Sequence, residues 1–211
     1  MKKLMLIGLL LLLPPNMLAS PISAAQKPCI SQSEVKFENE FRRLWIDHVL
    51  WTSNYITSAT TAGAEDQKQV LARLLKNQED IGNSIKPYYG EAAGNRLTEL
   101  LKEHITIAGD MVEAAKSGKG AKVNQLNKDW HRNADDIVAF LSSANPHLKN
   151  NDLKKLFYMH LELVTDDLSA SLVKDWDARI VSIDEGLTHI IIMADAISEA
   201  IVKQFPNQFK S

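Results

Sequence analysis

The sequence predicts an all-α protein, an up-and-down antiparallel bundle of about six helices with no sheet. Apolar residues recur at spacings of three and four, and no stretch alternates with a period of two. Between Pro28 and Pro206 the only prolines are Pro87 and Pro146, so long helices are not interrupted. The expected connections are short, and short connections place sequential helices antiparallel.

The N-terminal residues predict a secretory signal peptide over 1–25. Lys2 and Lys3 precede the apolar run Leu4–Leu13, which is too short for a membrane-spanning helix. Small residues follow, and cleavage after Ala25 fits them best. Two alternatives remain, an uncleaved N-terminal anchor and a lipoprotein processed at Cys29. The mature protein is expected to be secreted or extracytoplasmic, without a transmembrane segment.

The first two helices are expected over 33–60 and 66–85. Ser31 and Glu34 have the spacing of a capping box at the first start, and Pro87 ends the second. Their apolar stripes are Phe37, Phe41, Leu44, Trp51 and Tyr55, and Val70, Leu74, Ile81 and Ile85.

The third and fourth helices are expected over 91–116 and 121–144, separated by a Ser-Gly-Lys-Gly turn and ended by Asn145-Pro146. Their stripes are Ala93, Leu97, Leu100, Ala108, Met111 and Ala115, and Val123, Leu126, Trp130, Ile137 and Leu141.

The last two helices are expected over 152–174 and 176–204. Neither proline nor glycine separates them, so one kinked helix is an alternative. Their stripes are Leu153, Leu156, Val164 and Leu168, and Ile180, Leu187, Ile191, Ala194 and Ile201. The expected domains are a flexible segment 26–32, a single bundle 33–206 and a C-terminal tail 207–211. No internal repeat is recognised.

Polar side chains fall on the apolar stripes. His48, His104 and His160 occupy the stripes of the first, third and fifth helices. Asp167 and Asp184 lie on the stripes of the last two helices, while Asn77 and Asn133 lie just off theirs. Counted from the turns at ~1.5 Å per residue, these groups fall at similar heights, so a polar layer is expected at mid-bundle. His131 and His189 point away from their stripes, and His147 lies in a loop.

Such a layer has two interpretations, because buried polar groups must be satisfied. The first is a site for a divalent transition metal or a small ligand, with His48, His104, His160, Asp167 and Asp184 as ligands and the two asparagines in support. The second is a hydrogen-bond network that only fixes helix register. No Glu-x-x-His or His-x-x-x-His motif is present, which weakens the metal interpretation.

Composition and motifs exclude several functions. The 24 Lys and Arg against 26 Asp and Glu give a net charge of −2, without the basic surface of a nucleic-acid-binding protein. A single cysteine excludes an intrachain disulfide framework, a Cys-rich zinc site and a Cys-ligated iron–sulfur cluster. No phosphate-binding glycine loop or nucleophile elbow is present, and nothing selects a catalytic residue, so an enzyme is the least supported class.

Four segments, LWIDHVLWT (44–52), NQEDIGNSIKPYYG (77–90), LTELLKEHI (97–105) and MADAISEAIVKQFP (193–206), resemble an uncharacterised family of secreted bacterial helical proteins. The resemblance covers nearly all of the mature chain. Members often carry a glycosyltransferase label, but no motif here supports it and no catalytic residues follow from the resemblance. It implies a compact all-α extracytoplasmic protein. The expected function is therefore ligand or metal binding; the alternative is a structural or protein-interaction module at the cell surface.

Overall fold

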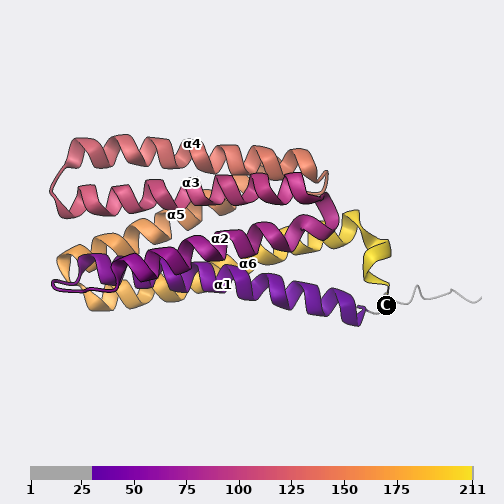
Figure 1. Cartoon of the computed structure of the whole chain (residues 1–211), viewed down its shortest axis with the longest axis horizontal. Coiled ribbons are helices and arrows are strands. Elements are labelled where there is room, and N and C mark those ends of the chain that lie inside the picture. The colour runs from indigo at the N-terminus through magenta and orange to yellow at the C-terminus, as the bar shows by residue number, and fades with distance from the viewer. Residues whose placement is uncertain (1–29, 211) are drawn as a thin grey trace, which may run out of the picture.

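The computed structural model describes residues 30–210 and contains no strand in that range. Six α-helices run along the long axis of the molecule (Figure 1). They are α1 (Gln32–Thr60), α2 (Gln67–Tyr89), α3 (Glu91–Lys116), α4 (Gly120–Ala144), α5 (Asn150–Val173) and α6 (Trp176–Gln204), followed by the short 3-10 helix η1 (Pro206–Phe209). The all-α prediction is confirmed. The predicted signal peptide and Cys29 lie outside the described residues.

The helices form a closed series. Each packs against the next in sequence, and α1 also packs extensively against α6, so the last helix returns to the first. The α2–α3 pair approaches closely at Gly82 and Gly94, where a Cβ on either would lie 2.6 Å from the carbonyl oxygen of the other. Because successive helices alternate in direction, α1, α3 and α5 run the same way.

The helix ends correct the predicted end of the second helix and confirm that the last two helices are separate. Helix α2 continues past Pro87 to Tyr89 and stops at Gly90, whose φ of 84° suits glycine. Helices α5 and α6 are separate. Lys174 adopts a left-handed conformation with φ of 60°, and Asp175 then caps α6 by accepting a hydrogen bond from the Ala178 amide. At the first helix, Ser31 accepts from the Glu34 amide as the capping pattern predicted.

The predicted C-terminal tail is anchored. Phe209 of η1 is buried, and its ring packs against Phe37 and stacks on Tyr88. The chain after α6 therefore closes one end of the bundle. No helix within residues 30–210 is long and apolar enough to span a bilayer.

The bundle contains an internal repeat, contrary to the sequence prediction of none. His48, His104 and His160 are 56 residues apart, and the same interval relates Leu44, Leu100 and Leu156. In the structure this interval corresponds to one helical hairpin. The three equivalent hairpins are α1–α2, α3–α4 and α5–α6, called hairpins 1, 2 and 3. Few residues other than these are identical at equivalent positions, so the repeat is weak in the sequence.

A hydrogen bond repeats with the same period. In each hairpin a side-chain nitrogen of the second helix donates to the carbonyl oxygen of the leucine one turn before the histidine. The bonds are Asn77 Nδ2 to Leu44 at 2.9 Å, Asn133 Nδ2 to Leu100 at 3.1 Å, and His189 Nε2 to Leu156 at 2.8 Å. Each spans 33 residues, so it fixes the two helices of every hairpin in the same register.

Candidate functional site

Three imidazole rings, one from each hairpin, meet in the core. The ring centroids of His48 and His160 are 5.3 Å apart, and those of His104 and His160 are 6.3 Å apart. His48 Nε2 lies 3.3 Å from His160 Nε2. All three side chains are at most 3% exposed. We call this group the histidine layer; it forms because the three parallel helices α1, α3 and α5 present equivalent positions to one another.

Asn133 fixes the proton position on His104. The Asn133 amide nitrogen donates to the Leu100 carbonyl oxygen, which leaves its Oδ1 facing His104 Nδ1 at 2.8 Å. An amide oxygen only accepts, so His104 Nδ1 carries the proton and Nε2 keeps a free lone pair. Metal-binding histidines commonly have this arrangement, in which the distal ring nitrogen donates to a fixed oxygen.

Gln78 fixes the proton position on His48, but it does so as a donor, whereas Asn133 is an acceptor. Its Nε2 donates to the Leu74 carbonyl oxygen at 2.8 Å and lies 3.2 Å from His48 Nδ1. His48 Nδ1 therefore accepts, and His48 Nε2 carries the proton that faces His160 Nε2. A chain of donors thus leads from Gln78 through His48 to His160.

Burial keeps the three rings neutral. Desolvation is the main cause in each case, because a charged imidazolium loses its water in the core. It lowers the pKa of His48 to about 3 and that of His104 to about 4. It also lowers the pKa of His160 well below its usual range, with smaller contributions from the neighbouring histidines. At neutral pH the layer therefore offers lone pairs rather than charges.

Three residues next to the histidine layer carry polar atoms without a hydrogen-bond partner. Among residues 30–210, four buried side-chain atoms lack a hydrogen bond, and three of them are Trp45 Nε1, Trp130 Nε1 and Gln78 Oε1. The Trp45 ring lies 5.7 Å from His48, and the Trp130 ring lies 5.0 Å from His104. A polar atom buried without a partner is rare in a core and calls for an explanation such as a bound water or ligand. The sequence patterns singled out neither tryptophan for this role, nor Gln78.

Asp167 is buried but belongs to a different interaction. Its carboxylate accepts from Arg179 Nε at 2.9 Å and from the Ser171 hydroxyl at 3.3 Å. Desolvation raises its pKa, which Arg179 partly offsets. Asp167 and His160 line one small cavity of about 20 Å³, enough for about one water molecule. The carboxylate is therefore near the layer but is engaged by Arg179.

The expectation that Asp184 joins the buried layer is wrong. Its side chain is exposed on the outer surface of α6, where it lines an open groove. Helix α6 is apolar on more than one side, so its stripe did not identify the buried side.

The remaining predicted polar residues lie as follows. Asn77 and Asn133 are fully buried and hold their hairpins in register. His147 is exposed and His131 is half-buried. His189, which the sequence placed away from its stripe, occupies the position of the two asparagines in hairpin 3. Its sequence signal was the interval of 56 residues after Asn133.

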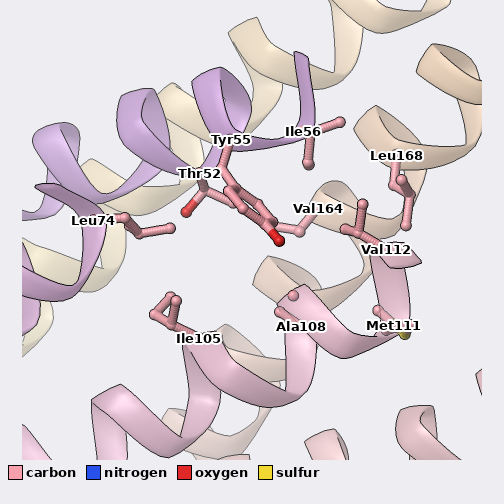
Figure 2. A pocket seen from close by; sticks show the side chains of 11 residues that line it. Thr52, Tyr55, Ile56, Leu74, Ile105, Ala108, Met111, Val112, Val164 and Leu168 are labelled. Carbon is pink, nitrogen blue, oxygen red and sulfur yellow. The ribbon is translucent and has the colours of Figure 1, made fainter. Parts of the chain in front are cut away.

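A second small cavity lies among the three hairpins, with residues of α1, α2, α3 and α5 in its lining (Figure 2). Figure 2 shows the Tyr55 ring reaching into it, with Leu74, Ile105 and Ala108 among its apolar walls. Its volume of about 20 Å³ and its apolar lining do not suit a ligand larger than water. The histidine layer therefore remains the candidate site.

The three histidine rings are not arranged as the ligands of one metal ion. In the described part of the chain, no group of three or more His, Cys, Asp or Glu side chains has the geometry of a metal site. Comparisons with protein-family models, curated proteins and solved structures found no match to the chain.

Proposed function

We propose that the protein is an extracytoplasmic binding protein whose histidine layer holds a divalent transition metal ion. The observation that carries the proposal is the meeting of three neutral imidazoles, with 3.3 Å between His48 Nε2 and His160 Nε2. Two nitrogens bound tetrahedrally at ~2.0–2.1 Å from one zinc ion are about 3.3–3.4 Å apart. Imidazole suits zinc, copper, iron and nickel.

Metal binding requires two rearrangements. The His104 ring must turn toward the other two rings, because the three do not converge as they stand. His48 must move its proton from Nε2 to Nδ1. The unpartnered Gln78 Oε1 can accept that proton if the amide turns over, which breaks the Gln78 Nε2 bonds to the Leu74 carbonyl oxygen and to Asn77 Oδ1. The first is a side-chain rotation and the second is a proton shift accompanied by an amide rotation; neither requires the helices to move.

Supplying metal to chelator-treated protein tests this function. We expect stoichiometric binding of Zn²⁺ or Co²⁺ by calorimetry and elemental analysis, abolished by His160→Gln, His48→Gln or His104→Gln. A double variant of the outlying histidines, His131→Ala with His147→Ala, is the matched control and keeps the metal. Since the ligands are already neutral, affinity should change little between pH 7 and 6, unlike that of a surface histidine site.

The second candidate is a structural layer in a cell-surface interaction module. The repeated hydrogen bonds from Asn77, Asn133 and His189 favour it, since they fix register without any bound ion. Folded protein that takes up no metal under any of these conditions would support this candidate and refute the first.

Export is part of the proposal and rests on the Lys2-Lys3 start and the apolar run Leu4–Leu13. The intact mass of protein recovered outside the producing cell should correspond to a chain that begins at Gln26. A lipid-modified chain beginning at Cys29 would contradict it.

A further inference from the structure

One set of outer-surface positions is charged in two hairpins and uncharged in the third. In hairpin 2, Arg132 pairs with Glu103 at 3.0 Å and with Asp136 at 2.9 Å. The equivalent positions of hairpin 1 also carry charges, namely Asp47, Lys76 and Asp80. In hairpin 3 they are Met159, Thr188 and Ile192.

This exchange leaves apolar side chains in solvent. Met159 is 45% exposed and Ile192 is 53% exposed. Val181, eleven residues before Ile192 and so on the same face of α6, is exposed where hairpins 1 and 2 carry Gln69 and Gln125. Of the ten exposed large hydrophobic side chains in residues 30–210, seven lie in hairpin 3 and none in hairpin 2; four of the seven, Leu172, Val173, Trp176 and Ile180, lie around the α5–α6 turn. The other three, Met159, Val181 and Ile192, replace polar residues of hairpin 2, and exposed apolar side chains of this kind mark an interaction surface.

The surface is hollowed. Met159, Leu163, Thr188 and Ile192 line a groove of about 400 Å³ between α5 and α6. Met159 also borders a second groove along the other side of α5, which includes Lys155 and Glu162. We call this region the hairpin 3 face.

The charges along α5 suggest what covers the face. Lys155, Met159, Glu162 and Asp166 follow at helical spacings of four, three and four, so they share one side of the helix. The basic residue lies on one side of Met159 and the acidic residues lie on the other. A two-fold axis passing close to Met159 would place Lys155 of one copy opposite Glu162 of the other. The α5 side of the face is therefore electrostatically complementary to itself.

We propose that the hairpin 3 face is a self-association surface through which two copies of the chain form an isologous dimer. The apolar centre is Met159 and Ile192, and each copy supplies one Lys155 and one Glu162 to the two flanking charge pairs. Acidic residues on the groove rim, Asp184 and Glu185, disfavour binding to an anionic membrane. The proposal does not depend on metal binding.

Sedimentation analysis of the purified protein over a range of concentrations tests it. We expect a dimer, and we expect Met159→Glu combined with Ile192→Asp to give a monomer with an unchanged helical circular dichroism spectrum. These substitutions copy Glu103 and Asp136 from hairpin 2, so the hairpin itself should tolerate them. Leu50→Glu, at an exposed apolar site of hairpin 1, is the matched control and should leave the dimer intact.

A charge exchange sharpens the test. Lys155→Glu should weaken the dimer, and adding Glu162→Lys in the same chain should restore it, because the two-fold axis pairs these positions. A wild-type protein that stays monomeric at the highest soluble concentration would overturn the proposal. So would a Met159→Glu, Ile192→Asp variant that remains dimeric.

Discussion

Hairpins 2 and 3 share an inner side and differ on the outer side. Each places a histidine in the layer, and each fixes its second helix by a bond to the carbonyl oxygen one turn before that histidine. Outside, hairpin 2 carries the Glu103–Arg132–Asp136 ion pairs where hairpin 3 carries exposed apolar side chains. Packing therefore constrains the positions at the histidine layer in both hairpins, whereas the outer positions vary more freely.

The largest expected effect is a dependence of the free energy of unfolding on pH, which tests the histidine layer that the hairpins share. Unfolding raises the pKa of each layer histidine from its lowered folded value to about 6.5, so the unfolded chain binds more protons. The free energy of unfolding should be constant above about pH 7 and fall as the pH drops below 6.5. Each histidine contributes up to about 1.4 kcal/mol per pH unit, and the three together about 4.

Urea unfolding at a series of pH values between 7.5 and 4.5 measures this slope. The His131→Ala, His147→Ala double variant should keep it, while His160→Gln should lose about one third of the histidine contribution. A free energy of unfolding that does not change between pH 7 and 5 would show that the rings are not buried as neutral groups.

An intermediate effect is expected where the interiors of the hairpins differ. Asp167 and Arg179 form a buried ion pair in hairpin 3, with side chains 7% and 18% exposed. The equivalent positions are Met111 and Val123 in hairpin 2. Arg179→Ala should cost about 3 kcal/mol, because it leaves the Asp167 carboxylate buried without its partner.

Copying the hairpin 2 residues should remove that cost. The double variant Asp167→Met with Arg179→Val should have a free energy of unfolding close to wild type, since apolar replacement of a buried pair is often neutral. Chemical unfolding of both variants measures the two free energies of unfolding to be compared. Equal losses in the two would mean that the Arg179 bonds to Ser53 and Thr57, rather than the ion pair, provide the stability.

The smallest effect is expected on the outer surface. Arg132→Thr copies Thr188 into hairpin 2 and removes both of its ion pairs. The Arg132 side chain is 55% exposed, so we expect a loss below about 1 kcal/mol in thermal or urea unfolding. A much larger loss would show that these surface charges stabilise the fold, and the outer positions would then not be free to vary.

The sequence alone determined the helical architecture. The spacing of apolar residues predicted six helices, because burying one side of a helix requires that period. It also placed His48, His104 and His160 on buried stripes, since those residues follow the apolar period of their helices. The sequence also contains the 56-residue interval. It is recognisable as a structural repeat from the equivalent hydrogen bonds of Asn77, Asn133 and His189 in the three hairpins.

The tertiary structure decided which polar groups meet. Asp184 follows an apolar stripe and is nevertheless exposed, because an isolated helix with two apolar sides does not specify which side its neighbours cover. Asp167 is engaged by Arg179 from the next helix, a contact that no local spacing encodes. The proton positions on His48 and His104 likewise depend on Gln78 and Asn133 across the hairpin, since a ring nitrogen donates or accepts according to the atom that packing places beside it.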